Sequence, residues 1–389
     1  MEQFTQMPFV PSRVCAGAVS TAAQLRASLP VTGEAAALVR RTQESLARIL
    51  AGHDDRLALI VGPCSIHDAN AALDYAARLA RLRGKHTDAL EIVMRVYFEK
   101  PRTTVGWKGW INDPMLDGTF RIETGLRVAR RLLVDIHALG VPAATEFLDL
   151  MTVPYLDDLV SWCAIGARTT ESQTHRQTAS GLAAPVGFKN STDGNVRIAI
   201  DAVEAARGAH HYLAPSDDGA LEIVATRGNR SAHVVLRGGK VPNYDAPSVA
   251  SACAELRRAG LPAHVVVDAS HGNSGKRAQA QIGVCEDIAK RLAHGESHVA
   301  GLMLESHLVE GRQDIGPGAS LVYGQSITDA CLGWSDTVEL VERLADAVRE
   351  RRRLTGGLTS GLTSGLTSGE LQAAREARSE MHAAQAITH

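Results

Sequence analysis

Four residues scattered along this 389-residue chain are of types that bind divalent metal ions. They are Cys64, His271, Glu305 and Asp329. A thiolate, an imidazole and two carboxylates form a mixed donor set that suits a borderline ion such as Mn, Fe, Co or Zn. An ion held in this way acts as a Lewis acid on a carbonyl oxygen. Two further histidines, His67 and His307, are rival ligands, which we interpret as neighbours of the site or as groups that face a substrate.

Taken singly, each of these residues also has an ordinary structural interpretation. A lone cysteine such as Cys64 is more often a small buried hydrophobic residue, and a lone histidine is more often a packed core residue. The metal hypothesis therefore depends on the four residues meeting in space.

A second set of residues is cationic. Its members are Arg95, Lys100, Arg102, Arg168, Lys189 and Arg237. Guanidinium groups bind phosphate or carboxylate through two parallel hydrogen bonds, and lysine adds a point charge. If these cations converge, they repel one another unless anions bind, so we expect at least two anionic groups in the site. The alternative is that each cation pairs with a neighbouring Asp or Glu.

The pattern of apolar residues predicts the elements that would bring both sets together. Eight short β-branched runs recur, at Leu57–Cys64, Glu91–Phe98, Pro142–Leu148, Trp162–Ala167, Ala184–Lys189, His233–Arg237, His264–Asp268 and Val299–Leu304. Several are continuously apolar, as parallel strands covered on both faces are. Helical periodicity follows at Thr119–Leu139, Val196–Arg207, Ser248–Ala259 and Lys276–Ala293. Eight such units predict an α/β fold, an eight-stranded parallel β/α barrel, and an open doubly wound sheet is the alternative.

In a β/α barrel the active site lies at the carboxyl ends of the strands. Residues of the two sets, together with Glu146, occur in or just after nearly every predicted strand. In chain order these are Cys64, Arg95, Glu146, Arg168, Lys189, Arg237, His271 and Glu305, and Asp329 lies in the loop beyond. So many charged groups at strand ends indicate one shared site, because each would otherwise need its own partner or solvent.

Three segments lie outside the repeated units. Residues 1–56 form an N-terminal extension with a helix at Gly33–Leu50 that Thr32 caps. Residues 209–230 form a hairpin insertion within the barrel domain, which comprises residues 57–353 and has a last helix that ends near Arg353. Residues 354–389 contain a repeated Gly-Leu-Thr-Ser motif and are predicted to be a flexible linker and tail.

The overall composition excludes several classes of function. The chain has 41 basic and 43 acidic residues, for a formal net charge of -2, which argues against a nucleic-acid binder. Its 6 cysteines include no Cys-x-x-Cys pair, and this spacing indicates a reducing compartment. We expect no signal peptide, because the first 20 residues contain no continuous apolar run, and the sequence has no apolar run long enough to span a membrane. We therefore expect a cytoplasmic protein.

At these residues the sequence resembles the short, metal-dependent (type I) class of 3-deoxy-D-arabino-heptulosonate 7-phosphate synthases. The motifs that carry the resemblance are Gly-Pro-Cys-Ser-Ile-His-Asp (62–68), Arg-Val-Tyr-Phe-Glu-Lys-Pro-Arg-Thr-Thr-Val-Gly-Trp-Lys-Gly (95–109), Ala-Thr-Glu-Phe-Leu-Asp (144–149), Ala-Ile-Gly-Ala-Arg-Thr-Thr-Glu-Ser-Gln (164–173), Gly-Phe-Lys-Asn (187–190), Leu-Arg-Gly-Gly-Lys (236–240), Glu-Ser-His-Leu-Val-Glu-Gly (305–311) and Ser-Ile-Thr-Asp-Ala-Cys (326–331). The resemblance extends over about residues 10 to 353.

The resemblance implies the first step of the shikimate pathway to aromatic amino acids. Phosphoenolpyruvate, erythrose 4-phosphate and water would give the seven-carbon product and phosphate. One divalent metal ion would be held by the four donors already named. The chain is also expected to form a homodimer or homotetramer, in which the N-terminal extension contributes oligomer or effector contacts.

The resemblance also implies a role for each cation. Arg168 and Arg237 match the groups that bind the phosphate of phosphoenolpyruvate. Arg95, Lys100 and Lys189 match groups around the same substrate, mostly its carboxylate.

Arg102 and Thr103 match the groups at the phosphate end of erythrose 4-phosphate, and we expect Glu146 to contact substrate as well. Either Lys100 or His271 could give the proton to the new alkoxide, and the sequence does not choose between them.

The region that would bind an effector departs from the family pattern. Relatives regulated by phenylalanine usually carry Ser where Ala183 stands and Phe where Tyr212 stands, and Val153-Pro154 replaces their Pro-Gln pair. An aromatic amino acid is the type of effector that the resemblance implies, but its identity, and whether this chain is inhibited at all, stay open.

Two other functions remain alternatives. A related 3-deoxy-octulosonate 8-phosphate synthase would use arabinose 5-phosphate, although Lys-Pro-Arg-Thr at 100–103 favours the four-carbon sugar phosphate. A barrel without catalytic activity could instead bind phosphorylated metabolites and regulate a partner.

Overall fold

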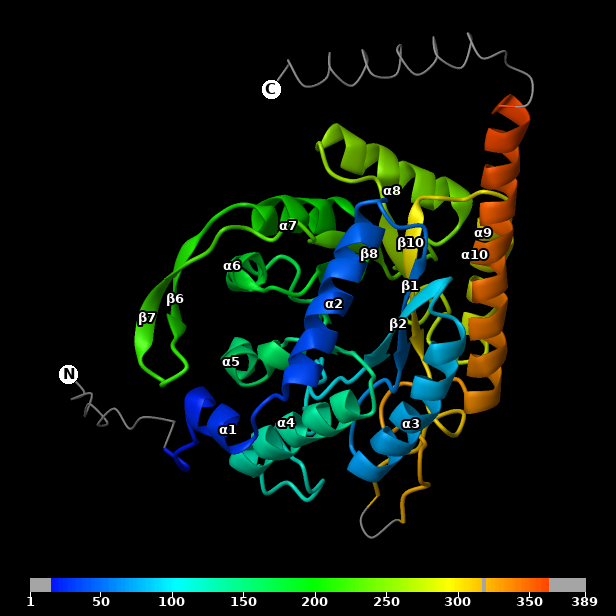
Figure 1. Ribbon diagram of the computed structural model, residues 1–389. Coiled ribbons are helices and arrows are strands. Elements are labelled where there is room, and N and C mark those ends of the chain that lie inside the picture. The colour runs from blue at the N-terminus through cyan, green and yellow to red at the C-terminus, as the bar shows by residue number, and fades with distance from the viewer. Residues whose placement is uncertain (1–14, 317–319, 364–389) are drawn as a thin grey trace, which may run out of the picture.

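Eight parallel strands close into a barrel in this computed structural model, which describes residues 15–316 and 320–363 (Figure 1). The strands are β1 (Leu57–Gly62), β2 (Leu90–Arg95), β3 (Ala143–Glu146), β4 (Trp162–Ile165), β5 (Val186–Lys189), β8 (His233–Leu236), β9 (Val265–Asp268) and β10 (Val299–Glu305). Their order around the barrel is β1-β10-β9-β8-β5-β4-β3-β2. Because every neighbouring pair is parallel, all eight carboxyl ends lie at one end of the barrel. The predicted eight-stranded β/α barrel is confirmed.

The strands are continuously apolar because both of their faces are buried. Along β1, Leu57, Leu59 and Val61 belong to the core layer between the strands and the surrounding helices. Ala58 and Ile60 belong to a second cluster, inside the barrel. Side chains of a strand point alternately to its two faces, so a strand covered on both sides carries apolar residues at every position.

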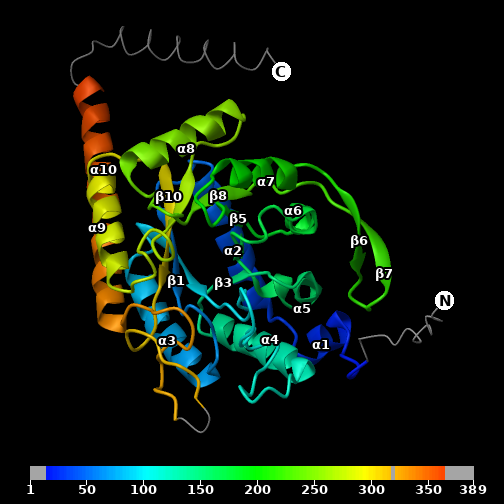
Figure 2. The same cartoon turned by 180° about the vertical axis from the view of Figure 1, so that it is seen from behind.

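Helices surround the barrel. They are α3 (Ala69–Lys85), α4 (Ile122–Ala138), α6 (Gln173–Gly181), α7 (Arg197–Arg207), α8 (Ala246–Arg258), α9 (Ala280–Ala293) and α10 (Trp334–Thr363). A short α5 (Val153–Leu156) lies between two 3-10 turns at Leu150–Thr152 and Asp157–Leu159. Asp68 caps α3, since its carboxylate accepts hydrogen bonds from the amides of Asn70 and Ala71 at 2.8 and 3.2 Å. Figure 2 shows α9 and α10 side by side on the outside of the barrel.

The N-terminal extension closes one end of the barrel. It contains α1 (Ala22–Ser28) and α2 (Gly33–Leu50), and Thr32 accepts a hydrogen bond from the amide of Ala35 at 3.2 Å. The predicted bounds and cap of α2 are therefore confirmed. Leu46, Ile49 and Leu50 of α2 join the cluster inside the barrel, beside residues near the amino ends of the strands. Because α2 covers the amino ends of the strands, the open end of the barrel is the one at the carboxyl ends.

A two-stranded antiparallel hairpin interrupts the repeated units. It consists of β6 (His211–Pro215) and β7 (Leu221–Ala225), joined by a turn in which Gly219 has φ 82°. A glycine adopts this left-handed conformation without steric cost. The hairpin projects from the side of the barrel, beyond α5 and α6 (Figures 1 and 2), as the insertion at 209–230 predicted.

Several predicted helix ends differ from those observed, and two of the differences exceed one turn of helix. The last helix was predicted to end near Arg353, but α10 continues to Thr363, so its final turns include the first residues of the expected linker. Glycines weaken a helix by only about 1 kcal/mol each, and no proline stops this one. The rest of the predicted tail, 364–389, lies outside the described residues, as do residues 1–14. The other difference is at α9, which begins at Ala280 and not at Lys276, because Lys276 lies in a turn with φ 61°.

No helix in the described part of the chain combines the length and the apolar character needed to cross a membrane.

Candidate active site

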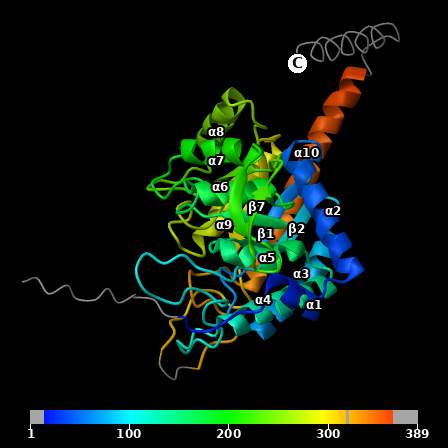
Figure 3. The same cartoon turned by 90° about the vertical axis from the view of Figure 1, so that its left-hand side faces the viewer.

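A cavity of about 240 Å³ opens at the carboxyl ends of the strands. The residues that line it include nine of those predicted for the site: Lys100, Arg102, Thr103, Glu146, Arg168, Lys189, Arg237, His271 and Asp329. The long loops that follow β2 and β10 extend on the same side of the molecule (cyan and orange in Figure 3). The other three predicted residues, Cys64, Arg95 and Glu305, are buried and are not part of the lining.

Three of the four predicted metal ligands lie together. One ligand atom each from Cys64, Glu305 and Asp329 lies within 4.8 Å of the other two. Cys64 follows β1 and Glu305 ends β10, and these strands are neighbours in which Gly62 pairs with Glu305. The Sγ atom of Cys64 lies 3.9 Å from Oδ2 of Asp329, which comes from the loop after β10.

His271 lies outside this group of three. Its Nδ1 atom lies 2.9 Å from Oδ2 of Asp268 and 2.7 Å from the hydroxyl of Ser270. These contacts fix the orientation of the ring, and His271 itself lines the cavity beside Asp329. Its backbone has φ 55°, an unusual conformation for a residue other than glycine, and strain of this kind is typical of functional sites.

The thiol of Cys64 lies in an environment that keeps it protonated unless a cation binds. Burial, followed by the negative charge of Glu305, raises the pKa of Cys64 to about 11, although the ammonium of Lys100 opposes this shift. A bound divalent cation reverses such a shift by its own charge and removes the proton. The thiol and the two carboxylates therefore fit a borderline divalent ion, and without a cation the buried Glu305 and the half-buried Asp329 would lie close together with like charges.

Lys100 connects the metal-binding group to the cavity. Its ammonium lies 3.0 Å from Sγ of Cys64 and 3.3 Å from the carbonyl oxygen of Cys64. Burial lowers the pKa of Lys100, but the neighbouring Cys64, Glu305 and Asp329 outweigh burial, so the pKa is raised overall. This lysine is a cation at neutral pH and can donate a proton.

Arg95 lies beneath the cavity and holds Glu305. Its side chain is fully buried, and Nη2 donates to Oε1 of Glu305 at 3.2 Å. The guanidinium also stacks 3.9 Å from the centre of the Tyr97 ring. Arg95 therefore positions a candidate metal ligand, and its predicted contact with a substrate stays a prediction.

The remaining cations differ in whether the protein neutralises them. Lys189 pairs with Asp268 at 3.1 Å. Arg102 and Arg168 instead donate to neutral groups, the carbonyl oxygen of Trp107 at 2.7 Å and the hydroxyl of Thr103 at 3.2 Å.

No ion pair with an Asp or Glu of the described chain neutralises Lys100, Arg102, Arg168 or Arg237. Pairing with neighbouring carboxylates, the alternative raised by the sequence, thus holds for Arg95 and Lys189 alone among the six predicted cations. Of the other four, Lys100 lies beside the metal-ligand group, and Arg102, Arg168 and Arg237 are available to bind anions from solution.

Two residues of the site were missed in the predicted set. Asp268 contacts both Lys189 and His271, and Lys276 lines the cavity. The sequence held a signal for Asp268, a carboxylate that directly ends a run of three valines. It held no signal for Lys276, which falls within a predicted helix.

Comparisons with known proteins agree with this fold. Residues 30–342 match the family model described as DAHP synthetase I family. The chain is 55% identical over 327 residues to a phospho-2-dehydro-3-deoxyheptonate aldolase of Haemophilus influenzae, covering 84% of this chain and 90% of that protein. It is 56% identical to the Phe-sensitive enzyme of that name from Escherichia coli K12, over 83% of this chain and 92% of that one.

It is also 55% identical to a Trp-sensitive enzyme of that name from Escherichia coli O157:H7, covering 85% of this chain and 95% of that protein. Among solved structures, the phospho-2-dehydro-3-deoxyheptonate aldolase of Francisella tularensis superposes with a TM-score of 0.85 at 47% identity, covering 86% of this chain and 98% of that one. The family model spans all eight strands of the barrel and the hairpin. The chain therefore belongs to the DAHP synthetase I family.

Proposed function

We propose that this chain condenses phosphoenolpyruvate with erythrose 4-phosphate and water to give 3-deoxy-D-arabino-heptulosonate 7-phosphate and phosphate. One observation carries the proposal: four cations without a carboxylate ion pair line a cavity that adjoins a group of three metal-ligand side chains, of which Cys64 and Glu305 are buried. Both substrates are anionic, so each needs cations that the protein has not already neutralised. The relatives' names agree with this reaction.

The cavity has groups for both substrates. We assign the phosphate of phosphoenolpyruvate to Arg168 and Arg237, and its carboxylate to Lys100 and Lys189. Glu146 lies in the same lining. Arg102 and Thr103 are assigned to the phosphate of the sugar. The hydrogen bond from Arg168 to Thr103 supports this arrangement, because it places the two anion sites next to each other.

A single divalent ion would be held by Cys64, Glu305 and Asp329, with His271 as the fourth ligand from the adjoining lining. When bound, such an ion supplies Lewis acidity toward the aldehyde oxygen of the sugar phosphate. Which of Mn, Fe, Co or Zn is used does not follow from the ligand types.

The reaction forms one carbon–carbon bond and releases one phosphate. The methylene carbon of phosphoenolpyruvate bonds to the aldehyde carbon, water adds to the carbon that carries the phosphate, and the carbon–oxygen bond to phosphate then breaks. The new alkoxide takes up a proton, for which Lys100 is the better of the two predicted donors. Nearby anions keep Lys100 charged, and its ammonium lies next to the ligand group. The remaining cations hold two like-charged molecules in contact, which lowers the barrier by positioning and by charge stabilisation.

The decisive experiment measures phosphate release from phosphoenolpyruvate in the presence of erythrose 4-phosphate or arabinose 5-phosphate. Release with the four-carbon sugar supports the proposal, and release with arabinose 5-phosphate alone would favour the octulosonate alternative. If neither sugar supports release, although phosphoenolpyruvate binds, the chain is a metabolite-binding barrel.

Metal dependence is tested by chelation of the same enzyme. We expect phosphate release to stop after complete removal of divalent ions and to return when one is added. The Cys64→Ser variant should lose metal affinity and turnover together, whereas Cys253→Ser, a buried helix position outside the site, should change neither. Turnover that survives full chelation would rule out a metal-dependent reaction.

We also propose an aromatic amino acid as an effector. A cavity of about 300 Å³, separate from the active site, is lined by the apolar Val39, Phe147 and Ala183 and by charged residues that include Arg40 and Asp157. Charges of both signs beside apolar walls suit the carboxylate, ammonium and ring of such a ligand. Turnover measured with phenylalanine, tyrosine and tryptophan in turn identifies the effector, and no change with any of them would reject this proposal.

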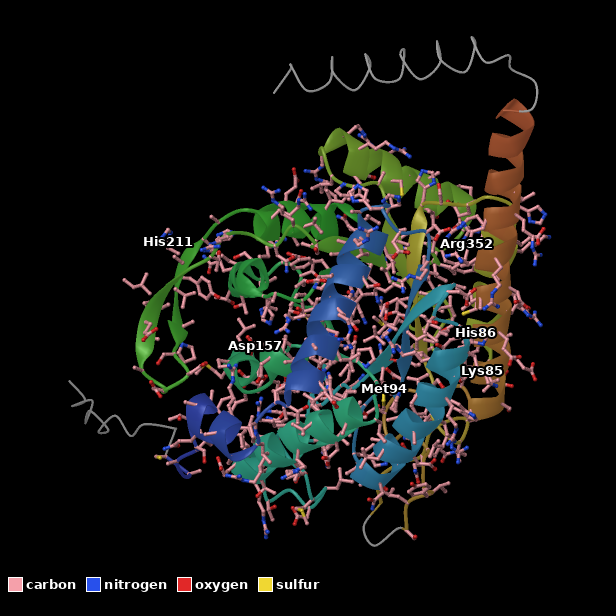
Figure 4. All side chains as sticks on the ribbon, in the orientation of Figure 1. Lys85, His86, Met94, Asp157, His211 and Arg352 are labelled. Atoms are coloured by element: carbon pink, nitrogen blue, oxygen red, sulfur yellow. The ribbon has the colours of Figure 1, made fainter. Side chains whose placement is uncertain are left out.

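A homodimer or homotetramer is the proposed assembly, with residues 1–56 and the hairpin as contact surfaces beside the barrel domain, 57–353. Leu213, Leu221 and Ile223 of the hairpin are 66%, 71% and 76% exposed. Leu213 pairs directly with Ile223, so the two side chains share one face of the hairpin. Figure 4 shows the hairpin, marked by His211, on the same side of α2 as Asp157. An apolar face of this kind on a projecting hairpin is typical of a protein interface.

A further inference from the structure

Lys276 belongs to the wall of the active-site cavity, together with Arg102 and Asp329. It closes a turn that begins at His271, and the amide of Lys276 donates to the carbonyl oxygen of His271 at 2.8 Å. One end of this turn thus carries a proposed metal ligand, and the other end carries a lysine with no role in the reaction as described so far.

The backbone at Lys276 is in a conformation that favours glycine. Its φ is 61°, and among the described residues other than glycine only Leu116, Phe120 and His271 also have positive φ. A side chain in this region is strained by contact between its Cβ and the backbone. The preceding residue, Gly275, has nearly the same φ, 58°, and is a glycine. A glycine at 276 would avoid this strain, so the lysine side chain is present at a cost to stability.

Hydrogen bonds to the ends of two strands hold the turn of residues 271–276 in place. The amide of Gly272 donates to the carbonyl oxygen of Arg237 at 3.0 Å. The side-chain amide of Asn273 donates to the carbonyl oxygens of Leu236 and Asp268 at 3.1 and 2.8 Å. Lys276 is thus presented from an ordered turn that is tied to the ends of β8 and β9, in contrast to an ordinary lysine on a loose surface loop.

The charge of Lys276 acts on the same part of the cavity as that of Arg102. Burial raises the pKa of Asp329, but Lys100, His271, Lys276 and Arg102 outweigh burial and lower it overall. Lys276 and Arg102 therefore both lie near Asp329. Within the described residues, Lys276 forms no ion pair with an Asp or Glu, so its ammonium is available to another anion.

We propose that Lys276 and Arg102 together bind the phosphate of the sugar substrate. This inference rests on the proposed condensation and names a residue of its second anion site. A phosphate monoester carries close to two negative charges at neutral pH, which one guanidinium does not neutralise. A planar guanidinium on one side and a point charge on the other complement the tetrahedral anion.

The test compares Lys276→Gly with the wild type in steady-state kinetics. Because glycine relieves the strained φ, the variant should have a melting temperature equal to or above that of the wild type. Its KM for erythrose 4-phosphate should rise by about tenfold or more, as expected for a lost charge-assisted contact. Its KM for phosphoenolpyruvate should stay within about twofold.

Two controls separate binding from structure. Lys276→Arg keeps the charge and should restore most of the affinity for the sugar phosphate. Lys240→Met removes an exposed lysine on the neighbouring loop, outside the cavity, and should leave both KM values unchanged.

Two results with Lys276→Gly would overturn the inference alone, an unchanged KM for erythrose 4-phosphate or an equal rise in both KM values. A wild-type chain that does not turn over the two substrates would instead overturn the proposed condensation, and this inference with it.

Discussion

Asp268 shows how one buried carboxylate orders the active site. It is fully buried at the end of β9 and lies 3.1 Å from the ammonium of Lys189 and 2.9 Å from Nδ1 of His271. Burial opposes its ionisation, but His271 and Lys189 hold the pKa of Asp268 well below its ordinary value. Asp268 therefore fixes a predicted substrate-binding group and a proposed metal ligand at once, without lining the cavity itself.

Replacing Asp268 by asparagine should destabilise the protein by about 3 kcal/mol, because the buried Lys189 would lose its counter-ion. We also expect kcat/KM to fall by on the order of 100-fold as His271 and Lys189 lose their orientation. The matched control is Asp287→Asn, which breaks a surface pair of 3.0 Å with Arg291 and should cost about 0.5 kcal/mol or less. Urea unfolding and steady-state kinetics measure both effects. Equal losses of stability in the two variants would contradict this account.

Glu99 should make the stability of the protein depend on pH. Burial, followed by the charge of Asp149, raises the pKa of Glu99 to about 7. In the unfolded chain a glutamate titrates near about 4.3. Because the pKa of Glu99 is higher in the folded chain than in the unfolded chain, its contribution to the free energy of unfolding is fully present below about pH 4. That contribution is lost as the pH rises through about 7.

The Glu99→Gln variant removes this titration while it keeps a carbonyl oxygen for the contact with the Thr152 hydroxyl at 3.3 Å. Between pH 4.5 and 8, the free energy of unfolding of the wild type should fall relative to that of the variant by about 3 kcal/mol. Urea unfolding at several pH values measures the difference. Parallel curves for the two proteins would show that Glu99 does not titrate in this range.

At the scale of elements, two helical glycines with different surroundings test how closely the helices pack. A Cβ at Gly125 in α4 would collide with the carbonyl oxygen of Ile111, whereas one at Gly283 in α9 would have open space around it. The close approach at Gly125 holds α4 against the loop that follows β2.

Gly283→Ala should therefore stabilise the protein by about 0.5–1 kcal/mol through helix propensity. Gly125→Ala should instead destabilise it by about 2 kcal/mol or more, since the backbone of Ile111 must move. Thermal and urea unfolding show whether each variant is more or less stable than the wild type. If both variants are stabilised, α4 does not pack against Ile111 as described.

At the scale of the whole molecule, the projecting hairpin should govern assembly. Ile223→Glu places a charge on its apolar face and should shift the protein to a smaller species while the barrel stays folded. Glu222→Lys, one residue away on the opposite face of the same strand, is the matched control and should keep the assembly. Light scattering after gel filtration measures the mass, and circular dichroism checks the fold. An unchanged mass for Ile223→Glu would exclude this face as an interface.

The sequence by itself determined the barrel, because strands buried on both faces must be continuously apolar and helices must follow at regular intervals. It also determined which residue types lie at the mouth, since the carboxyl ends of parallel strands converge. The extent of α2 and its cap at Thr32 followed from local rules and were predicted to the residue. The far ends of the helices were less predictable, as α10 shows, because a helix boundary depends on weak propensities.

Only the tertiary structure decided which cations of the site pair with carboxylates of the protein and which do not. Arg95 and Lys189 look like Arg168 and Arg237 in the sequence, but the first two pair with buried carboxylates and the last two do not. Lys276 fell within a helical pattern, and contacts with the ends of β8 and β9 place it in a turn instead. Ion pairs and close backbone packing join residues far apart in the chain. Periodicity and motif spacing carry no information about such contacts.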